Sequence, residues 1–245
     1  MCTIGYHKAL NLIFKNRDKS EITTEEMVAE DNYIAFRTKG ADYFSCGVNR
    51  YECGFVSAAV NTPQWTDLIY KGKVQQANQQ LKVEKRGLSN PMILVSEMLS
   101  RARKIKAIID KIESSELSWQ GYNILLVDSG QASLIETYNS DIRIRELRPR
   151  EVITNYFSLL DFGPKDYSEY PSSFRRHEYG NNNIKSAASV NDLFELLKPA
   201  DENKRKKIWR RGAFKTISSS IIDLKRRLIY YSKDINEDYS IFRMH

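Results

Sequence analysis

Cysteine stands at position 2, directly after the initiator Met1, and leads into the strand-like run Thr3–Tyr6. Once Met1 is removed, a thiol and a free α-amine share one residue. The amine has an unperturbed pKa of roughly 7.7 to 8.0 and the thiol one of about 8.5, so near neutral pH a base stands beside a nucleophile. The sequence therefore predicts an N-terminal cysteine nucleophile. The alternative is that Cys2 occupies the second position without any role in a reaction, as any residue type could.

The other thiols and the histidines indicate no second reactive centre. Cys46 and Cys53 flank a turn-like segment and could face each other across a hairpin. We interpret them as packed thiols, because no further Cys or His pair at ligand spacing completes a zinc site. His7, His177 and His245 are scattered, so Cys–His catalysis would need a pairing that the sequence does not show. We expect neither a metal nor a cofactor.

The chain has 245 residues, 41% of them hydrophobic, and no linker rich in Pro, Gly or Ser divides it. This length can bury a large core, so we expect one domain over residues 1–245. Three cysteines, the lack of a secretory apolar segment and the lack of a long apolar run favour a cytoplasmic protein without a membrane partner. The sequence does not decide whether the protein forms a homo-oligomer.

The net charge is +7, and the excess is concentrated in the segment 204–215 around Trp209. Basic residues interleaved with an aromatic could bind phosphate or nucleic acid. No helix-turn-helix, RNA-recognition or zinc-finger pattern accompanies them, which disfavours nucleic acid. The segment 204–215 has two other interpretations. It could be a solvated connection, or it could recruit an anionic substrate or cofactor.

Short strand-like runs dominate both ends of the chain, and helices fill the middle. From Pro91, apolar residues recur at spacings of four and three as far as Ile112, which predicts one amphipathic helix ending near 113–115. A second helix is expected over 190–197, capped by Ser189. The expected strands span 2–6, 11–15, 33–38, 43–48, 55–60, 122–128, 132–138, 142–147, 151–155, 216–223 and 227–232.

This order favours an α+β fold of two packed, mainly antiparallel sheets with helical layers outside, rather than an alternating parallel α/β fold. A nucleophile on the first residue of the first strand would be exposed for attack, and the sheet behind it would fix its direction.

Six segments in order resemble the N-terminal nucleophile hydrolases of the penicillin acyltransferase-like and cholylglycine hydrolase group. The chain also resembles proteins that begin Met-Cys and carry an Asn-Arg-Asp motif shortly afterwards. The likeness runs almost the full length, at motif level. The segments are Cys2-Thr3, Lys15-Asn16-Arg17-Asp18, Gly47-Val48-Asn49 with Cys53-Gly54-Phe55 leading toward Asn61, Thr154-Asn155-Tyr156-Phe157, Ser172-Ser173-Phe174-Arg175-Arg176, and Thr216-Ile217-Ser218-Ser219 with Ile221-Ile222-Asp223.

The resemblance implies a four-layer αββα sandwich. It also implies hydrolysis or acyl transfer at a linear amide of a small N-acyl compound, one that could be anionic. The Cys2 sulfur would attack the acyl carbonyl and form a thioester. Asp18 would hold the α-amine of Cys2, and Arg17 would favour the thiolate, because a nearby cation lowers the pKa of a cysteine.

The resemblance implies further roles for three residues. Asn155 through its side-chain amide and Asn61 through its backbone N–H would donate to the developing oxyanion. Arg175 would complete the polar network or meet a substrate carboxylate. The choice between Arg175 and Arg176 is open, and Lys15 departs from the Arg that many relatives carry there.

Each assignment has a simpler interpretation. Asp18 would then end a turn, Arg17 would be a surface charge and Asn61 would begin a loop. Asn155 lies in a strand-like run where Asn is disfavoured, which indicates a polar task or a strand end. The alternative function is a non-catalytic module of the same fold that binds an anionic ligand through 204–215.

Overall fold

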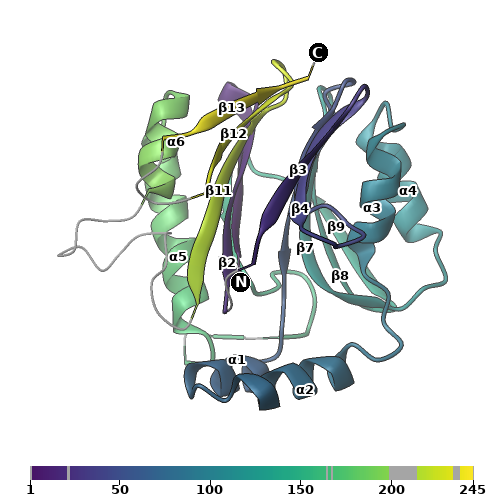
Figure 1. The fold of residues 1–245 in the computed structure, drawn as a ribbon, viewed down its shortest axis with the longest axis vertical. Coiled ribbons are helices and arrows are strands. Elements are labelled where there is room, and N and C mark those ends of the chain that lie inside the picture. The colour runs from purple at the N-terminus through teal and green to yellow at the C-terminus, as the bar shows by residue number, and fades with distance from the viewer. Residues whose placement is uncertain are drawn as a thin grey trace.

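Two antiparallel sheets pack face to face and carry helices on both outer faces (Figure 1). The structure, a computed structural model, describes residues 2–20, 23–163, 165–166, 168–198, 214–233 and 238–244. The predicted α+β sandwich is therefore confirmed. All pairings between the named strands of both sheets are antiparallel.

The first sheet has six strands in the order β10-β1-β2-β11-β12-β13. The chain therefore begins in the interior of this sheet rather than at its edge. The strands are β1 (Cys2–His7), β2 (Leu12–Lys19), β10 (Arg150–Ile153), β11 (Lys215–Asp223), β12 (Leu228–Ser232) and β13 (Ser240–Arg243).

The second sheet has seven strands in the order in which they occur along the chain. Each strand pairs with the next, with the helices α1 to α4 inserted between β6 and β7. The strands are β3 (Glu25–Glu30), β4 (Tyr33–Thr38), β5 (Cys46–Asn49), β6 (Gly54–Ala59), β7 (Trp119–Val127), β8 (Ala132–Asn139) and β9 (Asp141–Glu146).

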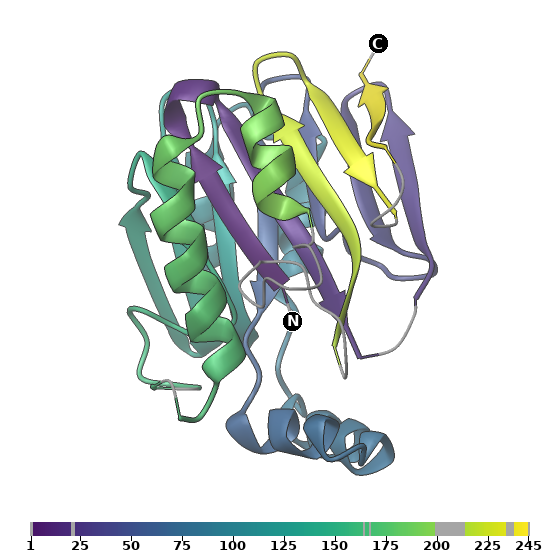
Figure 2. The same ribbon diagram turned by 90° about the vertical axis from the view of Figure 1, so that its left-hand side faces the viewer.

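Helices α5 and α6 cover the outer face of the first sheet, and α3 and α4 cover that of the second (Figure 1). Helices α1 and α2 lie below the two sheets, at the end where β1 begins (Figure 2). No helix in the described ranges is both long and apolar enough to cross a membrane. The helices are α1 (Pro63–Tyr70), α2 (Val74–Glu84), α3 (Pro91–Leu99), α4 (Ile105–Glu113), α5 (Pro171–Asn183) and α6 (Val190–Leu197), with short 3₁₀ turns η1 (Lys8–Leu10) and η2 (Ile184–Ser186).

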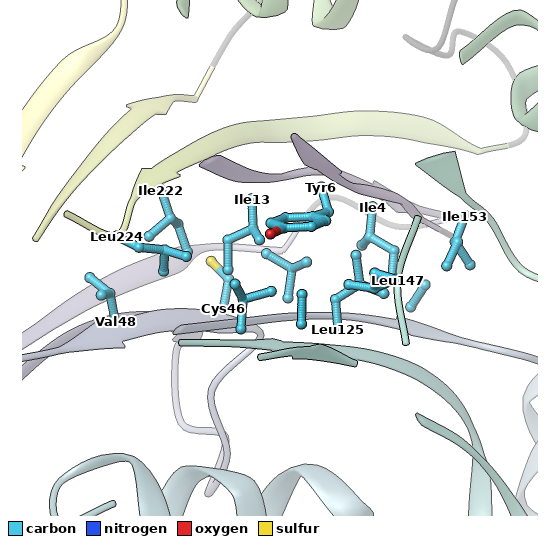
Figure 3. Close-up of a cluster of buried hydrophobic side chains, with 14 of the residues drawn as sticks. Ile4, Tyr6, Ile13, Cys46, Val48, Leu125, Leu147, Ile153, Ile222 and Leu224 are labelled. Atoms are coloured by element: carbon cyan, nitrogen blue, oxygen red, sulfur yellow. The ribbon is translucent and has the colours of Figure 1, made fainter. Parts of the chain in front are cut away.

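An apolar core fills most of the space between the sheets (Figure 3). Ile4 and Ile13 from the first sheet meet Val48 and Leu125 from the second, and all four are fully buried. Full burial of one such side chain contributes roughly 1.5–3 kcal/mol. Because side chains alternate along a strand, the intervening residues face the helices and form separate apolar clusters there.

The single long helix expected from Pro91 to about 113–115 is wrong, because the chain forms α3 and α4 with a break between them. Its apolar residues face one side in both helices, which is why the periodicity runs through the break. The Asn49 side chain donates to the carbonyls of Leu99 and Ala102, both over 2.7 Å. The Asp128 carboxylate accepts from the N–H of Ile105 over 2.9 Å. These distant side chains satisfy the backbone groups that the break exposes.

The sequence pattern did not predict helix α5 or strands β3 and β13. Helix α5 buries Ser173, Arg176 and Gly180, so its inner face is polar or small and lacks an apolar period. Strands β3 and β13 lie at sheet edges and carry largely exposed side chains. Helix α6 and its Ser189 capping box match the expected range. Most of the basic segment 204–215 lies outside the described residues.

Candidate active site

Cys2 lies at the open end of β1, beyond the last pair that β1 forms with β10. It pairs with Arg17 of β2, whereas β10 ends at Ile153, opposite Ile4. Cys2 packs against the core between the sheets, as Ile4 does, and is partly exposed. Thr3 alternates with them and faces α5. β2 therefore fixes the direction of Cys2 on one side, whereas β10 does not extend far enough to flank it on the other.

A buried polar network lies beneath Cys2, on the helix side of the first sheet. The Arg176 guanidinium donates to the carbonyl oxygen of Cys2 over 2.9 Å and to Oγ1 of Thr3 over 2.5 Å. It lies 3.5 Å from the Asp18 carboxylate, which accepts a 2.7 Å hydrogen bond from Oγ1 of Thr216. The two charges neutralise each other out of water, which a buried ionic group requires.

Close packing of α5 delivers Arg176 to this position. Gly180 lies one turn further along α5, and a Cβ there would come within 2.6 Å of Cγ1 of Val152 on β10. Only glycine allows the helix to approach the strand this closely. Arg175, the neighbouring residue, is exposed on α5, so the structure places Arg176 and not Arg175 beside Cys2.

Asn155 links Cys2 to the second sheet. Its Oδ1 accepts from the main-chain nitrogen of Cys2 over 2.8 Å and from Arg176 over 3.2 Å. Its Nδ2 donates to the carbonyl of Ala59, at the end of β6, over 2.6 Å. Asn155 is fully buried and lies two residues past the end of β10. A side-chain amide has two N–H donors, so one remains beyond the bond to Ala59.

The electrostatic surroundings of Cys2 favour the thiolate. Burial and the Asp18 carboxylate would raise the pKa of the thiol. The ammonium of Lys15, the terminal ammonium of the chain and a backbone hydrogen bond from Asp18 together outweigh them, and the pKa lies below its ordinary value. Lys15 is buried, and its Nζ donates to the carbonyl of Ser45 over 2.9 Å. Burial lowers the pKa of Lys15 in turn. Of the positive charges near the sulfur, that of Lys15 lowers the pKa of Cys2 most.

Arg17 lies opposite Cys2, but its charge is engaged elsewhere. Its guanidinium forms a buried ion pair with Glu25 of β3 and donates to Oγ1 of Thr38 on β4. The Glu25 carboxylate also accepts from the hydroxyl of Tyr231 over 3.1 Å. Arg17 thereby ties the two sheets together beside the thiol, with its positive charge largely compensated.

Asn61 lies in the segment between β6 and α1, two residues after Ala59. It is half-buried. Within the described part of the chain, neither its backbone N–H nor its side chain makes a hydrogen bond. A free backbone donor two residues from the Asn155 contact is consistent with an oxyanion role.

Cys46, Cys53, His7 and His177 make structural contacts, and His245 lies outside the described residues. Cys46 faces the core between the sheets and Cys53 faces α3 and α4, so the two thiols do not face each other across a hairpin. Both are buried free thiols, which confirms their interpretation as packed residues. His7 lies at the far end of β1 and bonds the carbonyl of Ala187. His177 packs its ring edge against Tyr156, not against Cys2.

Known structures share this arrangement of sheets and helices over nearly the whole chain. A cysteine-to-alanine variant of conjugated bile acid hydrolase from Clostridium perfringens matches with a TM-score of 0.61 at 13% identity, covering 100% of this chain and 92% of that one. Penicillin V acylase from Agrobacterium tumefaciens matches with a TM-score of 0.56 at 14% sequence identity. That match covers 100% of this chain and 86% of the acylase chain. The fold is that of the N-terminal nucleophile hydrolases.

A third structure with the N-terminal nucleophile fold is the Caenorhabditis elegans N-acylethanolamine-hydrolyzing acid amidase ortholog. It has a TM-score of 0.55 at 11% identity and covers 91% of this chain and 93% of its own. No protein-family model matches the sequence, and no curated protein matches it either. The likeness therefore lies in the three-dimensional fold.

Sequence reasoning found most of the network but missed two members. In the sequence, Thr216 belongs only to the segment that resembles a closing hairpin, yet its hydroxyl donates to Asp18. Lys15 departs from the family motif, but it alternates with Arg17 along β2. That alternation is the signal that places Lys15 and Arg17 on the same face of the sheet as Cys2.

Proposed function

We propose that the protein is a cysteine N-terminal-nucleophile amidohydrolase or acyltransferase. It would cleave a linear amide of a small N-acyl compound through a thioester on Cys2. The observation that carries the proposal is the 2.8 Å hydrogen bond from the main-chain nitrogen of Cys2 to Asn155, beside a thiol whose pKa is lowered. After Met1 is removed, that nitrogen is the α-amine, held by a polar side chain within reach of the sulfur.

The reaction would proceed in two balanced steps. The thiol proton passes to the α-amine while the sulfur bonds to the acyl carbon, and the carbonyl oxygen becomes an oxyanion. Collapse breaks the C–N bond, and the α-ammonium returns its proton to the leaving amine. Water, or an acceptor amine in transfer, then attacks the thioester and gives a proton through the α-amine to the departing sulfur.

The oxyanion would take hydrogen bonds from the second N–H of Asn155 and the backbone N–H of Asn61. Loss of one such donor typically costs about 2.7–4 kcal/mol of barrier. The bond between Asn155 and Ala59 brings the two donors to one place, because Asn61 follows Ala59 by two residues. Asp18 and Arg176 would hold the backbone of Cys2 rather than touch substrate.

A row of cations favours an anionic substrate. Lys15, Arg17 and Lys19 alternate along β2, so all three face the side of Cys2. Lys15 bonds a carbonyl and Arg17 pairs with Glu25, but Lys19 has no ion-pair partner among the described residues. Burial, with the charges of Arg17 and Lys15, lowers the pKa of Lys19 to about 8. A carboxylate on the substrate would pair with this ammonium and raise its pKa again.

The test is acyl-enzyme mass spectrometry with a panel of N-acyl amino acids and matched neutral N-acyl amines. We expect an intact mass without Met1, an acyl adduct confined to Cys2, and no adduct in Cys2→Ala. Lys19→Met should remove the preference for the amino-acid amides and leave the neutral amines unchanged.

Retained Met1 on the isolated protein, with ligand binding but no adduct, would favour the alternative, a non-catalytic module for an anionic ligand. Equal adduct rates for charged and neutral substrates would exclude the role of Lys19 while leaving that of Cys2 intact.

A further inference from the structure

Two buried polar side chains of the second sheet hold the segment that carries Asn155. Asn123 on β7 and Glu136 on β8 are cross-strand neighbours in the register of these strands. Both are fully buried. A polar pair in this position would be costly to bury unless its hydrogen bonds were made elsewhere.

Asn123 holds the backbone on both sides of Asn155. Its Nδ2 donates to the carbonyl of Thr154 over 2.7 Å and to the carbonyl of Tyr156 over 2.9 Å. Both N–H donors of this amide are therefore used on the carbonyls of the two residues that flank Asn155. The Asn155 side chain is left to point toward Cys2 and Ala59.

Glu136 holds the turn that follows. One carboxylate oxygen accepts from the N–H and the hydroxyl of Ser158, over 2.7 and 2.8 Å, and the other accepts from the N–H groups of Leu159 and Leu160, over 2.8 and 2.9 Å. All four bonds are accepted, which the ionised carboxylate does best. The Asn123 amide thus donates to carbonyls of the segment 154–160, and the Glu136 carboxylate accepts from N–H groups of the same segment.

We infer that Asn123 and Glu136 form a clamp, defined by these two residues, that positions Asn155 for catalysis. The inference rests on the proposed function of Asn155 as an oxyanion donor and as the partner of the Cys2 nitrogen. Residues 154–160 form no strand, so no ladder of backbone bonds fixes them. The clamp supplies that missing restraint from the opposite sheet.

A matched control exists within the chain. Asn49 is also fully buried, and its Nδ2 donates to two backbone carbonyls over 2.7 Å each, but these belong to the break between α3 and α4. Asn123→Ala and Asn49→Ala therefore remove the same atoms, and each leaves two carbonyls unpaired. Asn49→Ala also releases the N–H groups of Tyr51 and Cys53, which Oδ1 of Asn49 accepts over 2.9 and 3.0 Å, so it is the more severe structural loss.

We expect Asn123→Ala to lower kcat about a hundredfold with KM nearly unchanged, as misplacement by about 1 Å does. Asn49→Ala should lower the free energy of unfolding at least as much, because Asn49 also accepts from two backbone N–H groups, but it should keep kcat. The double variant Asn123→Ala/Asn155→Ala should be no slower than Asn155→Ala alone, since both act through one donor. Equal kcat in Asn123→Ala and Asn49→Ala, or additive losses in the double variant, would overturn the inference.

Two further measurements keep the inference testable if a variant folds poorly or no substrate is found. Glu136→Gln keeps the side-chain volume and one acceptor oxygen, so it should fold and lower kcat less than Asn123→Ala. The pH midpoint of Cys2 alkylation needs no substrate, and it should shift in Asn123→Ala but not in Asn49→Ala, because only the former frees the group bonded to the Cys2 nitrogen. An unshifted midpoint would count against the clamp, whereas absent turnover in the wild type would count against the proposed function alone.

Discussion

The space between the two sheets changes character from one end to the other along a single strand. At one end of β2, Ile13 packs among fully buried apolar side chains (Figure 3). Two and four residues later on the same face, Lys15 and Arg17 bring two charges beside Cys2, equally hidden from water. The apolar end contributes stability by burial alone, whereas the charged end must satisfy every group individually.

Two thiols along this gradient show what the difference does. Cys2 and Cys46 both feel the ammonium of Lys15, but the pKa of Cys46 is raised by burial, with Glu25 adding to the effect, while that of Cys2 is lowered. A cation is therefore not enough to activate a thiol. The pKa of Cys2 is also lowered by the terminal ammonium of the chain and by the backbone hydrogen bond from Asp18.

Replacing the thiols one at a time tests this contrast with the largest effect. Cys2→Ala should abolish turnover and leave the thermal midpoint of unfolding nearly unchanged, because the residue lies at a strand end. Cys46→Ala and Cys53→Ala should keep activity and lower stability, since both side chains are buried. Kinetics and thermal denaturation on all three variants measure this. Equal loss of activity in all three would mean that the gradient does not separate their roles.

Replacing Asn155, the proposed oxyanion donor, has the next largest expected effect. Asn155→Ala should lower kcat by roughly a hundredfold to a thousandfold with little change in KM, because the donor acts in the transition state more than in the ground state. Single-turnover acylation provides the measurement. A wild-type acylation rate would make Asn155 a structural residue only.

Asp18→Asn separates charge from shape at the polar end. The variant can still accept from Thr216 but leaves the Arg176 guanidinium unbalanced near the Cys2 backbone. An extra positive charge lowers the pKa of an amine, so the pH profile of kcat/KM should move to lower pH and the rate should fall about a hundredfold. The pH–rate profile of the folded variant decides, and an unchanged profile would contradict the role of Asp18.

Lys15→Met should have a smaller effect, on the thiol itself. Removing the cation raises the pKa of Cys2, so the pH midpoint of its alkylation should move upward, and Lys15→Arg should restore it. Alkylation followed by peptide mass spectrometry reads the midpoint for Cys2 alone. A midpoint that stays in place would assign the lowered pKa to the terminal ammonium and the Asp18 N–H instead.

The smallest change lies at the apolar end. Ile13→Val removes one buried methylene and should lower the free energy of unfolding by about 0.5–1.5 kcal/mol without changing kcat. Denaturant titration and steady-state kinetics measure the two quantities. A loss of kcat here would show that the two ends are coupled through β2.

The sequence by itself determined the α+β class and most strands, because these depend on local patterns of alternation and turn residues. The position of one cysteine was likewise enough to propose Cys2 as the nucleophile. It also marked Asp18 and Asn155, since each lies within a short motif. It did not reveal helix α5, whose inner face carries Ser173, Arg176 and Gly180 in place of an apolar stripe.

Only the tertiary structure decided which cation and which partner each site residue has. Arg176 reaches Cys2 from 174 residues away, and Glu25 takes the charge of Arg17 from another sheet. Asn123 and Glu136 act on a segment of the chain that their own strands never pair with. These choices follow from how two sheets and a helix close around one strand end, and burial makes each contact obligatory, so no local pattern in the sequence encodes them.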